Sequence, residues 1–600
     1  MFLKRCTRKK SGKGHTYWQL VESYRTARGS RHRVVAYLGE LSKSQRLGWG
    51  RLAVALDGKA SAKAKQLALF EPPEEADPVP DRIEVDLKGI RVAGTRDFGD
   101  IFLALTLWRV LGFDEVLQQA IAPGRAEVPW EKMACLLTIA RFVEPDSELH
   151  IADTWYARTA LSDLLGIPWD RVNDNRLYRT LDKILPLKSV VESHLKRRVG
   201  QLFSPDFDLL LYDVTSTYFE GQANSNAQAQ RGYSRDHRAD CKQVCIGLVV
   251  TRDGFPLAYE VFAGNRADVT TVEAIVEAME EKYGPAGRIW VMDRGMVSEE
   301  NLQFLRDRGG RYLVGTPRNM LKRFEQHLLN KDWIEVQEGI EVKLVSSGDG
   351  QETFVLCRSA DRREKERAMH GRFVERIEKA LIKLAEELAG GRRKRDQGII
   401  ERRIGRLLQR NWRAAGGFKI DVLEDSRYCS GLKLKWSRVH HWAEWASLSE
   451  GCYLLRTNII DQTPEQLWRT YIQLTDVEAV FRTGKSDLKI RPIWHQLEHR
   501  VQAHILFSFL AYALWKTLQI WMQRSGLGRG VRTVLEEFAR IKANDVTLRT
   551  SAGRDVTLCC ITHPDRPQQA LIDRLGLMIP ERLGRPRWIP DPQNLNRDVV

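Results

Sequence analysis

Apolar residues recur with two different periods along this chain, and the change of period marks its organisation. Helical spacing runs through residues 97–200, in FGDIFLALTLWRVLGF, WEKMACLLTIARFV and LKSVVESHLKRRVG. From residue 207, short apolar runs predict strands: FDLLLYDVTSTYF, then QVCIGLVVTRDGFPLAYEVFAG around an Asp253-Gly254 turn. Helix TTVEAIVEAMEEKY, strand RIWVMD, helix SEENLQFLRDRG and strand RYLVGTP follow. We therefore expect an all-α domain, then an α/β region whose mixed sheet has an antiparallel edge and helical cover.

The first 85 residues differ from the rest. Residues 1–60 predict a basic N-terminal arm with a β-hairpin, because five of the first ten residues are Lys or Arg and the runs TYWQLVESYRT and RHRVVAYLG follow. Such an arm fits a DNA contact and equally a solvated terminus beside an ordinary hairpin. Four prolines and several acids mark residues 61–85 as a linker.

Five further segments follow the linker. They are a helical domain at 86–200, the start of the α/β region at 201–318, an insertion at 319–455, the rest of the α/β region at 456–525 and a C-terminal region at 526–600. The insertion opens with the strand-like runs WIEVQEGIEVKLVSS and TFVLCRS, and two amphipathic helices then flank the basic turn GGRRKRDQG. The two helices predict a hairpin, which is either a packed arm with solvated charges or a contact for DNA or a second subunit.

Charge and cysteine usage narrow the class of protein. Lysine and arginine number 94 against 78 aspartate and glutamate, a net charge of +16, which favours a polyanionic partner and above all nucleic acid. The nine cysteines are scattered and no signal-peptide pattern opens the chain, which indicates reduced thiols in a cytosol. Cys241 and Cys245 have a near-metal spacing but no second pair, so we interpret them as structural thiols. The apolar run at 503–515 is too short for a bilayer and predicts a core helix, with no membrane partner.

Two aspartates interrupt the apolar strands of the α/β region. Asp213 lies within the first strand, and Asp293 ends the fourth. A charged residue inside an apolar strand conflicts with burial, and such conflicts concentrate at functional sites, which in open α/β sheets gather outside strand ends. Either aspartate alone could instead be a turn or capping residue.

A third acid lies on an amphipathic segment at residues 471–485. If this segment is one helix, Tyr471, Leu474, Glu478, Phe481 and Lys485 share one stripe. A stripe that places an acid between a tyrosine and a lysine is either a solvated edge or the face of an active site. Three converging carboxylates need a cation, and hard oxygen ligands suit Mg²⁺ or Mn²⁺. Two such ions, about 3.5 to 4 Å apart, suit phosphoryl transfer.

Four sequence blocks resemble bacterial insertion-sequence transposases of the DDE class, in the branch with a Tyr-x2-Arg-x3-Glu-x6-Lys signature. They are LLYDVTSTYFEG, YSRDHRADCKQVCIGLVVTRDGFPLAYEVFAGNRADVTT, IWVMDRGMVSEENL and YIQLTDVEAVFRTGKSDLKIRPIWHQLEHRVQAHILFSFLAYALWKTL, spanning about 200 to 520. The resemblance implies a ribonuclease H-like catalytic core, formed by 201–318 and 456–525 and interrupted by the insertion. The insertion falls in the 185 residues (478 − 293) between the second aspartate and the glutamate.

The resemblance also assigns roles to single residues. Asp213, Asp293 and Glu478 match the metal-binding acids of the family, and Tyr471 and Lys485 match the signature residues that contact transposon-end DNA. Leu474 stands where the family has arginine, so one phosphate contact is missing or comes from elsewhere; the nearby candidates are Arg482 and Arg491. The following block DLKIRPIWHQLEHR fits either a DNA backbone contact or a loop that packs Trp494 into the core. Related transposases hold a flipped base with an aromatic residue of the insertion, which here has four tryptophans: Trp412, Trp436, Trp442 and Trp445.

The function implied by the resemblance is metal-dependent cleavage at the ends of an insertion sequence, followed by strand transfer to target DNA. The expected partners are double-stranded DNA, both terminal inverted repeats and target, and a second subunit in a homodimeric synaptic complex. The helical domain at 86–200 would recognise the terminal repeats, and the protein would work in the bacterial cytoplasm on the nucleoid. Two other classes stay open: a ribonuclease H-like nuclease without transposition, and a domesticated, catalytically silent DNA-binding protein.

Overall fold

The computed structural model describes residues 2–10, 13–26, 29–39 and 82–589, except 123, 125, 204–206, 285–287, 348–349 and 529. The N-terminal strands β1 (Phe2–Lys10), β2 (Lys13–Thr26) and β3 (Gly29–Gly39) form one antiparallel sheet in that order. The predicted hairpin is therefore confirmed, and the basic first segment adds a strand to it. Most of the predicted linker lies outside the described residues.

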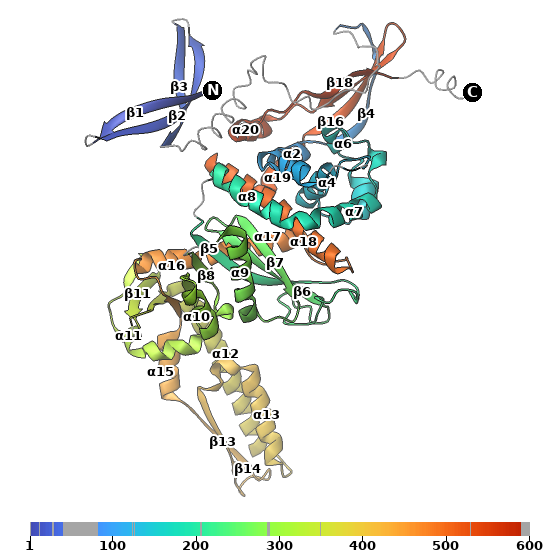
Figure 1. The fold of residues 1–600 in the computed structure, drawn as a ribbon. Coiled ribbons are helices and arrows are strands. Elements are labelled where there is room, and N and C mark those ends of the chain that lie inside the picture. The colour runs from blue at the N-terminus through green and yellow to red at the C-terminus, as the bar shows by residue number, and fades with distance from the viewer. Residues whose placement is uncertain are drawn as a thin grey trace.

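Helices dominate from residue 99 to 203, as their apolar spacing predicted. They are α2 (Gly99–Val110), α3 (Phe113–Ala120), α4 (Trp130–Val143), α5 (Glu148–His150) with a π-helical continuation (Ile151–Trp155), α6 (Leu161–Leu165), α7 (Asp174–Ile184) and α8 (Lys188–Phe203). Of these helices, α2, α4 and α7 pack against α18 (Glu498–Arg524), a helix from near the other end of the chain that is buried on nearly all sides (Figure 1). Helices from both ends of the sequence therefore share one apolar core.

A second sheet joins the start of the helical region to the C-terminal region. Its order is β18 (Arg582–Trp588), β17 (Asp555–Ile561), β16 (Lys542–Thr550), β4 (Val85–Asp97), with α19 (Val531–Ala539) and α20 (Arg566–Leu575) nearby. The expectation of an all-α segment at 86–200 is thus wrong for its first residues. β4 is mostly exposed although Val85, Leu87, Ile90 and Val92 alternate with polar residues on either side of Gly89, so pairing with β16 rather than burial holds it as a strand.

The central sheet has nine strands, in the order β10-β11-β12-β15-β9-β8-β5-β6-β7. Strands β9 (Arg311–Gly315), β8 (Ile289–Met292) and β5 (Leu209–Tyr218) are neighbours and mutually parallel. Strands β6 (Gln243–Thr251) and β7 (Pro256–Ala263) form the predicted antiparallel edge hairpin. Helices α9 (Val272–Tyr283) and α10 (Glu299–Asp307) cover one face, and α17 (Leu474–Ser486) and α18 cover the other. The prediction of a mixed sheet covered by helices is confirmed.

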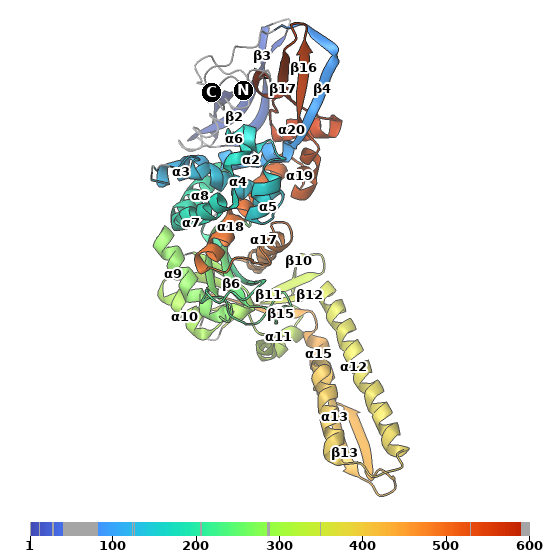
Figure 2. The same cartoon turned by 90° about the vertical axis from the view of Figure 1, so that its right-hand side faces the viewer.

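The insertion contributes both strands and an arm. β10 (Ile334–Gln337), β11 (Ile340–Ser346), β12 (Thr353–Ser359) and β15 (Cys452–Thr457) extend the central sheet next to β9, near the short helices Arg318–Phe324 and α11 (Glu325–Leu329). Between β12 and β15, the chain forms α12 (Ala360–Ala389), α13 (Gln397–Arg410), α14 (Trp412–Ala415), the hairpin β13 (Phe418–Glu424) and β14 (Leu432–Arg438), and α15 (His440–Ser449). These elements project from the body of the protein (Figure 2). The predicted helical hairpin is present, but β10, β11, β12 and β15 belong to the main sheet, and only β13 and β14 form a sheet of their own.

Among the described residues, one helix is long and apolar enough to cross a membrane by length and composition. This helix is α18, and 83% of its apolar window is buried inside the protein. Its apolar residues therefore serve the core, as the sequence predicted.

Candidate active site

Three strands bring the candidate aspartates together at the centre of the sheet. The last residue pairs of the two parallel ladders are Tyr212–Met292 and Met292–Val314. The next residues along the three strands are Asp213, Asp293 and Gly315. Neighbouring strands lie about 4.8 Å apart, so these three positions form one row. Side chains alternate along a strand, which directs both carboxylates to the face covered by α17 and α18.

The Asp213 carboxylate is held in an unfavourable environment for its charge. Burial is the main cause that raises its pKa, and the charge of Asp293 adds to it, so that the pKa is about 7 despite a hydrogen bond from Val214 N at 2.8 Å. Arg235 opposes this effect, and its guanidinium also pairs with Asp268. The row therefore contains like charges close together, with one arginine as the nearby counter-charge.

Tyr471 lies over the glycine of this row. Its hydroxyl oxygen is 3.5 Å from Asp293 Oδ1. The same hydroxyl lies so close to Gly315 that a Cβ atom there would overlap it. Tyr471 belongs to α16 (Pro464–Ile472), whereas Glu478 belongs to α17, and the two helices are separated at Gln473. The prediction of one continuous helix at 471–485 is therefore wrong, although the tyrosine still faces the aspartates.

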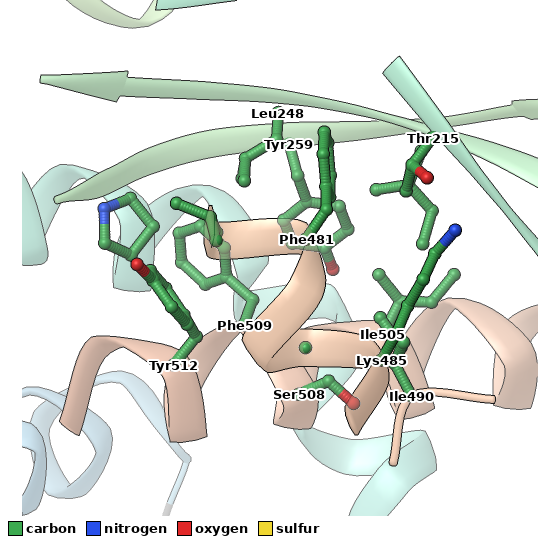
Figure 3. Close-up of a pocket in the computed structure, with 14 residues that line it drawn as sticks. Thr215, Leu248, Tyr259, Phe481, Lys485, Ile490, Ile505, Ser508, Phe509 and Tyr512 are labelled. Carbon is green, nitrogen blue, oxygen red and sulfur yellow. The ribbon is translucent and has the colours of Figure 1, made fainter. Parts of the chain in front are cut away.

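The remaining stripe residues have different environments. Glu478 is exposed, and within the described ranges no group of three or more His, Cys, Asp or Glu side chains is placed to hold a metal ion. Phe481 and Lys485 point from α17 toward the sheet residues Thr215, Leu248 and Tyr259 (Figure 3). They line an apolar cavity of about 50 Å³ between α17, α18 and the sheet. The structure thus pairs two of the three predicted acids and leaves Glu478 outside the pair.

The predicted DNA-contacting cations are mostly engaged inside the protein. Lys485 Nζ donates to Asp236 Oδ1 at 2.9 Å, and Arg491 pairs with the same carboxylate. Asp236 is 4% exposed, and its Oδ2 is buried with no hydrogen-bond partner among the described residues. Burial lowers the pKa of Lys485, and Asp236 offsets part of that effect. Arg482 is exposed on α17, whereas Leu474 packs against the core.

The segment that follows α17 contacts the sheet on one side and the helical region on the other. Ile493 bridges to Phe219 at the end of β5. On the other side, His495 Nε2 lies 3.3 Å from Glu148 Oε1. Trp494 itself is 68% exposed, so the interpretation that packs this tryptophan into the core is wrong. In the insertion, Trp436, Trp442 and Trp445 are at least partly buried, whereas Trp412 is 69% exposed.

Sequence reasoning missed the residues Arg235, Asp236 and Asp268. All three surround the aspartate row, and two of them come from the polar loop between β5 and β6. A signal was present, because the charged run SRDHRAD interrupts a stretch of Gly, Asn and Gln between two buried strands. Polar loops at strand ends are where site residues concentrate.

Comparison with known families agrees with this geometry. The family model described as "Transposase DDE domain" matches residues 204–514, which hold both strands and helices of the site. The chain belongs to this family of DDE transposases. A second model, "IS1634 family transposase, N-terminal domain", matches residues 3–72. The protein is therefore an insertion-sequence DNA transposase, an enzyme that acts on DNA.

Comparisons with curated proteins and with solved structures do not extend this family assignment. No curated protein matches the transposase. Among solved structures, the chain is similar to one described as "Cryo-EM structure of piggyBac transposase synaptic complex with hairpin DNA", with 8% sequence identity and a TM-score of 0.35 over 75% of this chain and 82% of that chain.

Proposed function

We propose that this transposase cleaves phosphodiesters at the ends of an insertion sequence and transfers the freed 3′-hydroxyl to target DNA, with Asp213, Asp293 and Glu478 as its metal-binding acids. The observation that carries the proposal is the strand register that sets Asp213 beside Asp293 on one face of the sheet. Two adjacent carboxylates at the ends of parallel strands are costly unless a cation joins them.

The donor atoms of the pair fit a hard divalent cation. Carboxylate oxygens are the ligands that Mg²⁺ and Mn²⁺ prefer, and we propose two such ions. Divalent ions supply Lewis acidity to the attacking water and the leaving oxygen in phosphoryl transfer. Asp213 and Asp293 would hold them at the strand ends, while Tyr471 would fix the orientation of Asp293.

Glu478 requires a shift of α17 to join this pair. Only Val477 and Val480 are buried on this helix, and a cavity lies beneath its C-terminal half. Leu474 and Phe481 are only partly buried. The Lys485–Asp236 pair anchors the C-terminal end of the helix, so the shift would move the turn that holds Glu478 about this anchored end. We propose that bound DNA stabilises the position of α17 in which Glu478 faces the aspartates.

The order of elements supports a ribonuclease H-like core. Strands β5, β6 and β7, then the alternation of α9, β8, α10 and β9, precede the glutamate helix in the chain. We propose further that the helical region at 86–200 recognises terminal repeats, that Lys485 and Tyr471 position phosphates, and that two subunits assemble on paired ends in the bacterial cytoplasm.

One assay tests the proposal. Purified protein is incubated with DNA that carries both ends of its element, with Mg²⁺, Mn²⁺ or EDTA, and every cut is mapped. We expect cuts at the element ends and joined products only with a divalent ion. Unspecific nicking would favour the nuclease, and binding without any cut would favour the silent DNA-binding protein. Cleavage in EDTA would overturn the metal mechanism.

A further inference from the structure

The arm formed by residues 360–438, here called the basic arm, holds most of the surplus positive charge. It contains 22 lysine and arginine residues against 12 aspartate and glutamate residues, a surplus of ten out of sixteen for the whole chain. Its internal packing does not use this charge, because an apolar cluster from α12, α13 and the β13–β14 hairpin forms its core. The surplus therefore needs another explanation.

Acids of the arm neutralise only part of this charge. Five ion pairs lie within the arm: Arg362–Glu366, Lys379–Glu375, Arg403–Glu387, Arg427–Asp425 and Arg438–Glu378. A neutral pair has little attraction for a polyanion at a distance greater than the Debye length, about 8 Å at physiological salt. The net field of the arm must come from its other cations.

One side of α13 carries cations that are not paired with an acid. Arg402, Arg406 and Arg410 are four residues apart, so they lie on one side of the helix, and all are exposed. Over the part of the chain that the structure describes, none of these three side chains forms an ion pair or a hydrogen bond. We call these three residues the arginine stripe. It is about 12 Å long, while duplex DNA carries one charge per about 1.7 Å of its axis.

The segments before and after α13 also carry exposed cations. The turn before it has four exposed cations, Arg392, Arg393, Lys394 and Arg395. After it, the exposed ring of Trp412 lies 5.3 Å from the guanidinium of Arg413. Exposed arginines beside an exposed aromatic ring are typical of surfaces that bind nucleic acid.

We propose that the arginine stripe binds the sugar–phosphate backbone of duplex DNA without regard to sequence. The proposal rests on the function above only in taking DNA as the partner. Guanidinium groups spaced along one side of a helix suit phosphate contacts, which fix the position of a duplex without selecting its sequence. The arm thus holds DNA away from the strands β5 and β8 that carry the aspartate row (Figure 1).

The test compares two triple variants of the full-length protein. One carries Arg402→Gln, Arg406→Gln and Arg410→Gln, and the matched control carries Lys379→Gln, Arg403→Gln and Arg438→Gln. Both lose three positive charges from the same arm, but only the first loses unpaired cations. Fluorescence anisotropy measures Kd at several salt concentrations in EDTA, with one duplex that has an element end and one with a shuffled sequence. Circular dichroism melting confirms that both variants fold.

We expect the slope of log K against log salt to become shallower by about 2.7 for the stripe variant, on both duplexes, since each lost phosphate contact removes about 0.9. For the control variant, the same slope should become shallower by less than one unit. An unchanged slope, or equal losses in both variants, would overturn the proposal. So would lost self-association in sedimentation with an unchanged slope, which would assign the stripe to a second subunit. Because EDTA prevents the chemistry, this result is independent of the metal-binding acids.

Discussion

Asp236 accepts a hydrogen bond from Lys485 at 2.9 Å, and Arg491 pairs with the same buried carboxylate. One acid from the loop after β5 therefore fixes two cations that come from α17 and from the segment behind it. The cluster has a net charge of about +1, counted from its ionised side chains at neutral pH. The structure consequently gives these two cations a fixed position before any DNA is bound.

Replacing Asp236 by Asn should separate binding from cleavage. The amide keeps the size of the side chain but removes the charge that holds Lys485 and Arg491. We expect a steeper salt dependence of DNA binding, by about one unit, and cleavage that is roughly ten- to a hundredfold slower because the cations lose their position. Single-turnover cleavage and anisotropy measure the two effects.

The control for this variant is Asp240→Asn. Asp240 lies in the same loop and pairs with Arg238, but it is exposed, so the same change of charge should leave cleavage almost unaltered. If Asp236→Asn cleaves at the wild-type rate, Asp236 has no positioning role.

The acids of the proposed site should be required for cleavage but not for binding. Asp213→Asn, Asp293→Asn and Glu478→Gln should each abolish cleavage and leave the Kd for end DNA within a few fold, since phosphate contacts provide most of the affinity. Glu465→Gln is a matched control, because Glu465 is an exposed acid on the neighbouring helix that pairs with Arg469. Retained cleavage in Glu478→Gln would remove this residue from the site.

Gly315→Ala should disturb the site through Tyr471. The new methyl group would overlap the Tyr471 hydroxyl, so the partly buried ring must move away from Asp293. Overpacking of this kind typically costs about 1 to 3 kcal/mol, and we expect slower cleavage together with a lower midpoint in urea unfolding. Gly371→Ala is the control: it lies within α12 with nothing near its Cβ, so it should stabilise the protein by up to about 1 kcal/mol. Wild-type cleavage by Gly315→Ala would argue against the role of Tyr471.

Glu148 should give the protein a stability that disappears in acid. Burial alone would raise its pKa, but the hydrogen bond and charge of His495 and the charge of Arg141 lower it to about 2. A lowered pKa in an acid means that the stabilisation is complete above the unfolded value of 4.5 and is lost as the pH falls toward 2. The shift corresponds to about 3 kcal/mol. Urea unfolding at several pH values should show this loss in the wild type and a flatter profile in Glu148→Gln.

The elements with a clear apolar period were predictable, and those that depend on distant partners were not. The run around Asp213 and the Asp253-Gly254 hairpin carry their own signals, and the structure has both. β4 was missed although Val85, Leu87, Ile90 and Val92 alternate with polar residues, because Gly89 interrupts the alternation and the partner strand β16 is distant in sequence. The break at Gln473 was also missed, since α16 and α17 continue the same apolar spacing on both sides of it.

The candidate site was predictable in part. Asp213 and Asp293 stand out because charged residues are rare within apolar strands, and the register places them side by side. The environment of Lys485 was not predictable, because Asp236 is 249 residues away in the chain. An ion pair of this sequence separation leaves no local pattern.

The pairing of β4 with β16 also determines when the protein becomes complete. Thr95 and Asn544 face each other across these strands but are separated by 449 residues in sequence. During synthesis, β4 and the helices after it leave the ribosome long before β16 and α18 exist, and domains fold as their segments emerge. Part of the core of the helical region therefore stays exposed to solvent until the chain is nearly finished. A transposase truncated during translation would lack this closure, so only full-length molecules would reach DNA in a folded form.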